Sequence, residues 1–364
     1  MTKPPRPVSS GPPFDLPERE PVTRVRRTDP LALRKLKGKR TQPMAGYEST
    51  FVDIVDYIVR ITEEIWVDRG IGRIYDTYDH ACTIYSPYGV VRSVEEVIAS
   101  TAATLTSFPD GELHHLNVAW SGDEVAGFYT SHLGQSRSTN LGPSAYGAST
   151  GRKINVRFVA DCISRDNKIH TEWLVRDNGA VVRQLGFDLQ DAARRLAGLP
   201  AAELNVMSPP TRLLGQAPRA PFDGPTDTPD GWARAMFDML WNQRRLDKLP
   251  NYYATDIIVH GGGGRVSVGL RNLSALLLQI MTSLPDGTMH VDHVCWSEET
   301  DGAILAVRWR LEGSTKQGGV LGACPEGRAA VLMGMSHLRF AGLKIIEEWM
   351  VFDEVGALVG AYRG

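Results

Sequence analysis

The sequence KIHTEWLVRDNGAVVRQLG at residues 168–186 occurs again, in altered form, as KIIEEWMVFDEVGALVGAY at residues 344–362, 176 residues further along the chain. The same offset relates SFPDG at 107–111 to SLPDG at 283–287. A nearly constant offset over such a distance indicates duplication of a whole domain, because the units of solenoid proteins repeat every ~20–50 residues. The chain is therefore predicted to contain two copies of one fold.

Each copy has the same expected order of elements. Apolar periodicity predicts helices at 50–68 and 93–107 in the first copy and near 230–248 and 271–284 in the second. Long strands follow, and in the first copy they are expected at 112–121, 123–133, 152–165 and 168–178. Helices followed by a run of strands predict an α+β fold of two tandem cone-shaped half-barrels, each with helices packed on a curved, mostly antiparallel sheet.

The prolines predict where the domains begin and end. Of 22 prolines, nine lie in residues 1–43 and seven in residues 198–230, and the interiors of helices and sheets tolerate few. We expect four segments: a proline-rich basic tail at 1–45, extended or disordered; a first domain at 46–197; a proline-rich linker at 198–229; and a second domain at 230–364.

Composition narrows the function classes. The net charge is −2, and the basic tail has a single aromatic residue, Phe14, instead of aromatic residues interleaved with its basic ones, so nucleic acid is not an expected partner. A membrane helix needs ~20 apolar residues, and the sequence has no such run. The cysteines lack zinc-site spacing, and no dinucleotide or metalloprotease motif occurs, so we expect no cofactor and no metal. The scattered cysteines favour a cytoplasmic protein. The four cysteines are Cys82, Cys162, Cys295 and Cys324.

The PDG turn, TGRKINV at 150–156 and the two long stretches quoted above resemble the SnoaL-like polyketide cyclases of the nuclear transport factor two-like superfamily. The resemblance covers most of both domains and implies a cone-shaped cavity between sheet and helices. It also implies an aspartate on the last strand as general acid/base, at Asp177 and Asp353, assisted by a histidine. The approximate position of that histidine is His337 in the second copy and Asp161 in the first.

The alternation of side chains along strands gives a second approach to the site. If Trp173 points into the cavity, Asp177 does too, and an odd-length turn adds Arg157 and Asp161 to that face. A two-residue turn would place the other row of that strand, Ile154 to Cys162, there instead. We favour the first register, in which Asp161, Asp177 and Arg157 share an apolar cavity. Sharing that cavity would push the pKa values of the two carboxyl groups apart. A structural ion pair between Arg157 and Asp161 explains the pattern as well.

Further polar and aromatic residues are expected to contact a substrate. Tyr85 and His260 occupy matching places at the end of the first strand of each copy, and His114 matches His290 after the PDG turn. Strand capping or a hydrogen bond in the core explains these four equally well. The expected substrate-binding residues are Tyr85, His114, Tyr129, His132, Trp173, His260 and His290.

The sequence thus favours a cofactor-independent acid/base enzyme: an aldol-type cyclase, an isomerase, or a C–C or C–O lyase. Its substrate is expected to be a small aromatic or polyketide-like molecule. The alternative is a non-catalytic binding or assembly module in which one or both cavities have degenerated, and the replacement of Arg157 by Met333 in the second copy fits it. Which copy is active stays open. Two copies in one chain predict an internal pseudo-dimer, with further self-association left open.

Overall fold

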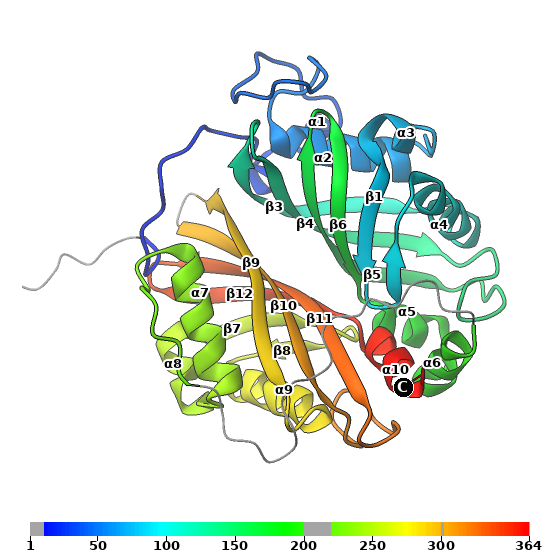
Figure 1. Ribbon diagram of the computed structural model, residues 1–364, viewed down its shortest axis with the longest axis vertical. Coiled ribbons are helices and arrows are strands. Elements are labelled where there is room, and N and C mark those ends of the chain that lie inside the picture. Colours follow the sequence, from blue (N-terminus) through cyan, green and yellow to red (C-terminus); the bar gives the residue numbers. More distant parts are fainter. Residues whose placement is uncertain (1–10, 200–219, 300–301, 364) are drawn as a thin grey trace, which may run out of the picture.

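The computed structural model describes residues 11–199, 220–299 and 302–363. Most of the linker expected at 198–229 lies outside these residues. Within them, two copies of one α+β arrangement follow an N-terminal segment (Figure 1). That segment contains a short 3₁₀ helix, η1 (Val25–Arg27), and one helical turn, α1 (Pro30–Leu33).

The first copy runs from α2 to α6. Its helices are α2 (Ile54–Trp66), α3 (Arg73–Thr77), α4 (Val94–Ser107), α5 (Asn178–Leu185) and α6 (Leu189–Ala197). Its strands are β1 (Tyr78–Ser86), β2 (Gly89–Val91), β3 (Glu112–Asp123), β4 (Gly127–Thr139), β5 (Lys153–Arg165) and β6 (Lys168–Arg176).

The second copy runs from α7 to α10 in a matching order. Its helices are α7 (Pro229–Phe237), continued by the π-helical turn η2 (Asp238–Asn242), then η3 (Leu246–Lys248), α8 (Leu249–Tyr252), α9 (Leu270–Ser283) and α10 (Glu354–Arg363). Its strands are β7 (Tyr253–Gly261), β8 (Val266–Val268), β9 (Thr288–Glu299), β10 (Gly302–Ser314), β11 (Ala329–Ala341) and β12 (Lys344–Phe352).

The local sequence explains where the main helices begin. Asp53 caps α2 by accepting the N–H of Asp56 at 2.9 Å, and Ser93 caps α4 by accepting the N–H of Glu96 at 3.2 Å. The first helix was expected from residue 50; it begins at 54, because the capping side chain is that of Asp53. Its apolar stripe is buried, with Ile54, Ile58 and Ile61 almost inaccessible to solvent.

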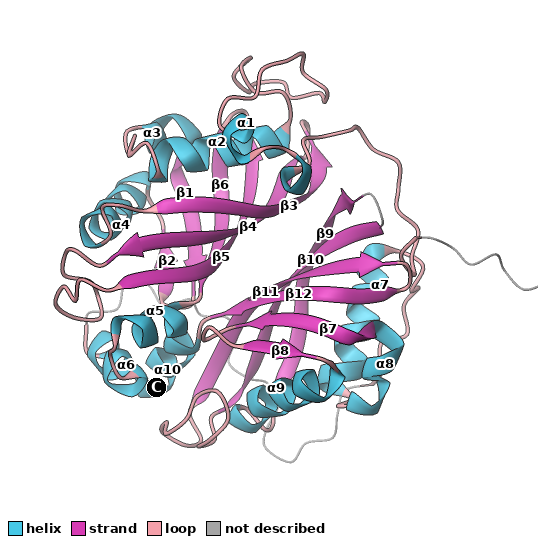
Figure 2. Ribbon diagram, turned by 180° about the vertical axis from the view of Figure 1, so that it is seen from behind, coloured by secondary structure: helices cyan, strands magenta, loops and turns pink. Residues whose placement is uncertain are grey.

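The twelve strands form one sheet with a symmetric order. The order is β2-β1-β6-β5-β4-β3-β9-β10-β11-β12-β7-β8, so the two copies meet where β3 and β9 pair antiparallel at Trp120 and Trp296. Only β1–β6 and β7–β12 are parallel pairs among the described strands. The sheet bends so that its two halves face each other, with α2, α3 and α4 outside one half and α7, α8 and α9 outside the other (Figure 2).

Each half of the sheet thus has an outer face, covered by its own helices, and an inner face that meets the other copy. Side chains of both copies interlock on the inner face: Val159 and Val175 of the first pack with Met333, Met335 and Val351 of the second. The C-terminal helix α10 crosses over and packs on α5 and α6 (Figure 1). These contacts form the expected internal pseudo-dimer interface.

The N-terminal segment lies along both copies. Phe14 packs edge-on against Phe340 of the second copy, while Val25 and Leu33 belong to the core beneath α2. Between them, Arg19 donates to the carbonyl oxygens of Trp120 at 2.8 Å and Trp296 at 2.7 Å. The segment therefore covers the only described strand pair that joins the two half-sheets.

Candidate active site

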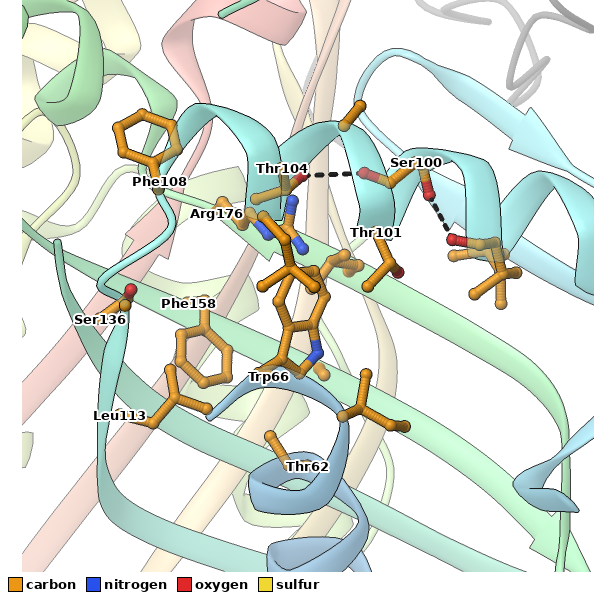
Figure 3. Close-up of a pocket in the computed structure, with 18 of the residues that line it drawn as sticks. Thr62, Trp66, Ser100, Thr101, Thr104, Phe108, Leu113, Ser136, Phe158 and Arg176 are labelled. Atoms are coloured by element: carbon orange, nitrogen blue, oxygen red, sulfur yellow. Dashed lines mark hydrogen bonds between the residues drawn. The ribbon is translucent and has the colours of Figure 1, made fainter. Parts of the chain in front are cut away.

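The first copy contains a cavity of about 390 Å³ between its half-sheet and the helices α2 and α4. Ile154, Val156, Phe158, Ala160 and Cys162 of β5 form its floor, and α2 and α4 form its roof. The volume lies in the range that holds small organic ligands. Phe158 and Leu113 point into it from the sheet, and Trp66 and Thr104 from the helices (Figure 3).

One end of this cavity carries a cation. The guanidinium of Arg176, at the end of β6, lies 5.1 Å from the centre of the Trp66 ring, and the two side chains point toward each other (Figure 3). Burial lowers the pKa of Arg176, opposed mainly by the charge of Glu172. No hydrogen bond or ion pair of the Arg176 side chain occurs within the described part of the chain. Its donors are therefore available to a ligand.

Glu172 lies on the same strand face and forms a buried pair. Tyr78 donates its hydroxyl proton to Glu172 Oε2 at 3.0 Å. Burial raises the pKa of Glu172, and the hydrogen bond from Tyr78 counteracts part of that rise. Two further tyrosines of the cavity wall, Tyr88 and Tyr146, have their pKa values raised by burial and so stay neutral. The polar end of the cavity thus combines one arginine, one carboxyl group and three phenols.

A chain of three titratable side chains reaches the cavity on the face of the sheet that α2 covers. His132 of β4 lines the cavity, and its Nε2 lies 2.8 Å from Nδ1 of His115 on β3. His115 Nε2 lies 2.7 Å from Oε1 of Glu63 on α2. Burial lowers the pKa of His132 well below its usual value, with the neighbouring imidazole of His115 as the next cause. His132 is consequently a neutral imidazole near pH 7.

The outer end of this chain meets a second cavity. Glu63 Oε2 lies 3.1 Å from Nε of Arg34, and both residues line a cavity of about 300 Å³ together with His114 and His115. With Glu63 ionised, His115 Nε2 donates to it and His115 Nδ1 accepts from His132 Nε2. That tautomer leaves Nδ1 of His132 unprotonated, so it can accept a proton.

The second copy provides an internal comparison. Trp120 pairs with Thr130 and Trp296 with Leu305, so positions of β4 and β10 correspond at an offset of 175. Gly134 then matches Trp309, and the ring that covers Gly134 is Phe158, while the ring that covers Gly334 is Trp309. Large and small residues have exchanged strands, and Trp309 fills the space beneath the helices of the second copy.

The other polar side chains of the first cavity are replaced in the same way. The replacing residues are all apolar and belong to the buried core of the second copy. The matching residues of the first and second copy are Ser100 and Leu276, Thr101 and Leu277, Thr104 and Ile280, His132 and Val307, Ser136 and Leu311, and Arg176 and Phe352. The Tyr78–Glu172 pair persists, as Tyr253 and Glu348, with a hydrogen bond of 2.9 Å, and Ser107 persists as Ser283. The first copy is therefore the one that retains a polar-lined cavity.

The structure corrects which strand face was expected to line the cavity. Asp161 pairs with Trp173 and Val159 with Val175, so the predicted register is confirmed. It results from a two-residue turn combined with a bulge opposite His170, because Ile163 pairs with Thr171 and Ser164 with Ile169. This row, however, faces the second copy. The apolar row expected to pack on a neighbouring domain forms the floor of the cavity instead, and the interface combines apolar contacts, such as Val159 with Met333, with buried polar groups such as Asp161.

Asp161 consequently belongs to a buried network between the copies. Tyr129 donates its hydroxyl proton to Asp161, and Arg308 of the second copy donates to the Tyr129 hydroxyl at 3.0 Å. The Arg308 guanidinium lies 3.6 Å from the centre of the Trp173 ring. Burial raises the pKa of Asp161, and the charge of Arg308 opposes the rise. Neither Tyr129 nor Trp173 lines the cavity of the first copy.

Arg157, His260, Tyr85 and His337 occupy the same interface. Arg157 lies at its edge and also borders the cavity, with Nη2 3.2 Å from His260 Nδ1. Tyr85 stacks on Trp173, and His260 stacks on Trp349. His337 lies 3.0 Å from Asn117 Nδ2 and 3.0 Å from Ser131 Oγ, and burial lowers its pKa to about 3.

The two aspartates of the family motif end their strands as helix caps. Asp177 accepts the N–H of Ala180 at 3.0 Å and those of Gly263 and Gly264, in the second copy, at 2.7 and 3.0 Å. Asp353 accepts from Asn178 Nδ2 at 2.7 Å, and burial raises its pKa to about 7. The last strand was expected to reach residue 178; it ends at Arg176, because Asp177 is the N-cap of α5.

Of the remaining expected substrate contacts, His132 lines the cavity, whereas His114 and His290 do not. His114 lines the outer cavity, and His290 lies 3.7 Å from Glu312. Sequence reasoning missed Arg176, Glu172, His115 and Glu63 as cavity-associated groups. A signal existed for two of the four: Arg176 and His115 align with Phe352 and Val291 in the second copy, and such polar-to-apolar differences mark the divergent cavity.

The described residues contain no group of three or more metal-ligating side chains that could hold a metal ion. Within the same residues, no helix has the length and apolar character to cross a membrane.

Comparison with known proteins identifies relatives of both copies. Residues 56–185 and 232–359 match the model of a family described as SnoaL-like polyketide cyclase. No curated protein matches the chain. Similar solved structures include AclR from Streptomyces galilaeus (18% identity, 37% of this chain and 98% of that chain, TM-score 0.32) and IdmH from Streptomyces antibioticus (20%, 36% and 97%, 0.32). TsrD from Streptomyces laurentii is 16% identical over 37% of this chain and 97% of its own, with a TM-score of 0.32.

Proposed function

The chain belongs to the SnoaL-like polyketide cyclase family, and from this premise we propose that its first copy is a cofactor-independent acid/base enzyme acting on a small aromatic or polyketide-like molecule. The second copy, with its filled interior, serves as the structural partner. The observation that carries the proposal is the hydrogen-bonded chain from Glu63 through His115 to His132, which ends in the polar-lined cavity.

The hydrogen-bonded series of Glu63, His115 and His132 is suited to moving a proton away from a bound substrate. Nδ1 of His132 takes a proton from a carbon next to a carbonyl group, His132 passes its Nε2 proton to His115 Nδ1, and His115 passes its own to Glu63. The positive charge that would be costly on a buried imidazole is thereby neutralised at the carboxylate. The resulting enolate attacks a second carbonyl group in a cyclase, or the reverse steps break that C–C bond in a lyase.

The internal comparison supports His132 over the other titratable groups. The Tyr78–Glu172 pair recurs in the second copy, where the cavity is filled, so packing explains that pair. The histidines of the chain are replaced there by Val291 and Val307. A group retained only beside the open cavity is the better candidate for chemistry.

The test needs no knowledge of the natural substrate. An aryl methyl ketone is incubated with the protein in D₂O, and exchange of its methyl protons is followed by NMR. General base catalysis contributes about 10²–10⁴-fold, so His132→Gln and His115→Leu should lose most of the acceleration. His114→Gln, one residue away but outside the cavity, is the matched control and should exchange like the wild type.

A non-catalytic binding module is the second candidate. It is favoured by the position of Asp177, which caps α5 and holds the loop of the second copy instead of lining the cavity. Saturable binding of aryl ketones without accelerated exchange would support this candidate and would contradict the enzyme proposal.

A further inference from the structure

The Arg176 guanidinium is a cation without a counter-ion in direct contact. Its one close contact of charge type is with the Trp66 ring at 5.1 Å, and the described part of the chain offers its N–H groups no hydrogen-bond acceptor. Charges placed away from water are ordinarily paired, because desolvation is costly. The guanidinium of Arg176 is therefore available to bind an anionic group of a ligand.

The groups around Arg176 do not supply that anion. Glu172, the acidic side chain on the same face of β6, offsets part of the cost of burying Arg176 through its charge, but it forms its hydrogen bond with Tyr78 and no ion pair with the guanidinium. Tyr78, Tyr88 and Tyr146 are phenols whose pKa values are raised by burial, so they carry no charge near neutral pH. Asp353 touches Asn178 rather than the arginine.

The other residues that line the cavity indicate the shape and polarity of the rest of the ligand. Its floor is the apolar row of β5, and Phe158 and Trp66 present rings to its interior (Figure 3). The hydroxyls of Ser100, Thr104 and Ser107 on α4 already hydrogen-bond within the helix, as Thr104 does to the Ser100 carbonyl at 3.0 Å. Such a wall favours a flat, largely apolar molecule.

The second copy has a different residue at the position that matches Arg176. Phe352 stands where Arg176 stands in the first copy, and it is fully buried beside Trp309. An arginine is therefore not needed at this place for the fold.

We propose that Arg176 binds a carboxylate, so that the ligand of the first cavity is an aromatic or polyketide-like carboxylic acid. The inference rests on the proposed function for the location of the site, and it names the chemical class of its ligand. A planar guanidinium binds a carboxylate through two parallel N–H···O bonds, with Trp66 stacked against it. The arginine acts on the bound ground state, separately from proton transfer at His132.

The experiment compares two probes of nearly equal shape, 2-naphthoate and 2-naphthamide, by isothermal titration calorimetry on the full chain. The wild type should bind the carboxylate at least about tenfold more tightly than the amide, as expected for charge-assisted hydrogen bonds. Arg176→Met should abolish that preference, and Arg176→Lys should retain part of it. Arg137→Met, an exposed arginine on β4, is the matched control and should behave like the wild type.

Every result bears on the proposal. Equal binding of the two probes by the wild type, or a preference that survives in Arg176→Met, would overturn it. His132→Gln should keep the carboxylate preference while losing proton exchange, so the two proposals fail separately. If neither probe binds, both the carboxylate site and the ligand-binding cavity on which it rests are contradicted. A thermal unfolding curve for Arg176→Met shows whether that variant is folded, and Phe352 indicates that an apolar residue is tolerated there.

Discussion

At the scale of single residues, the aspartate that the family motif places in the active site has a different set of contacts here. Asp177 accepts three backbone N–H groups, two of them from the β7–β8 loop of the second copy. Burial raises its pKa although these donors oppose the shift. The side chain therefore holds a helix start and a loop together, and this role can be separated from catalysis by experiment.

We expect Asp177→Ala to lower the free energy of unfolding by about 2–4 kcal/mol, because a helix cap is lost and buried N–H groups are left without acceptors. Asp177→Asn, which keeps one acceptor oxygen, should cost less. Urea unfolding measures both, and proton exchange on the aryl ketone measures activity per folded molecule. A stable Asp177→Asn protein that had lost exchange would restore the catalytic role that the resemblance implies.

At the scale of secondary-structure elements, equivalent strands have exchanged large and small residues. In the first copy Gly134 of β4 makes room for Phe158 of β5, and in the second Gly334 of β11 makes room for Trp309 of β10. Trp309 also stacks on Trp241 and donates its indole N–H to Ser336 at 3.1 Å. Trp309 is thus the largest of the fully buried side chains that fill the interior of the second copy.

Trp309→Gly should therefore open a cavity in the second copy. Removing a buried tryptophan costs about 3–5 kcal/mol, and the vacated space should accept free indole. The melting temperature of the variant, but not of the wild type, should rise with added indole. Trp66→Gly, at the edge of a space that is already open, is the matched control and should cost less. A cost below about 1 kcal/mol would show that the second copy was not filled by this residue.

The same elements show how far the sequence could be interpreted. The duplication, the α+β class, the main helices and the pairing of β5 with β6 were predictable, because they depend on offset, periodicity and alternation. The face that lines the cavity was not, since alternation separates two rows without saying which one faces the helices. The usual assumption that the wholly apolar row packs between domains failed, because this interface buries the polar network of Asp161, Tyr129 and Arg308 beside its apolar contacts. The contact of Glu63 with His115 joins residues 52 positions apart and has no local signature.

At the scale of the whole molecule, the N-terminal segment fastens the two copies where their sheets meet. The Arg19 guanidinium lies 4.3 Å from the centre of the Trp120 ring and 3.4 Å from that of Trp296, and it donates to both carbonyl oxygens. Trp120 and Trp296 are equivalent residues of the duplication and the one described register pair between β3 and β9. A single side chain outside both copies thus completes their junction.

We expect Arg19→Ala to lower the free energy of unfolding by about 2–4 kcal/mol, from the loss of two charge-assisted hydrogen bonds and cation–π contacts. Arg19→Lys should recover only part, because an ammonium group cannot reach both carbonyls from one planar fork. Arg24→Ala, which removes an exposed ion pair with Glu298, is the control and should cost about 1 kcal/mol or less. If urea unfolding of Arg19→Ala separates into two transitions, the arginine couples the copies. A curve like that of Arg24→Ala would show that the sheets hold together without it.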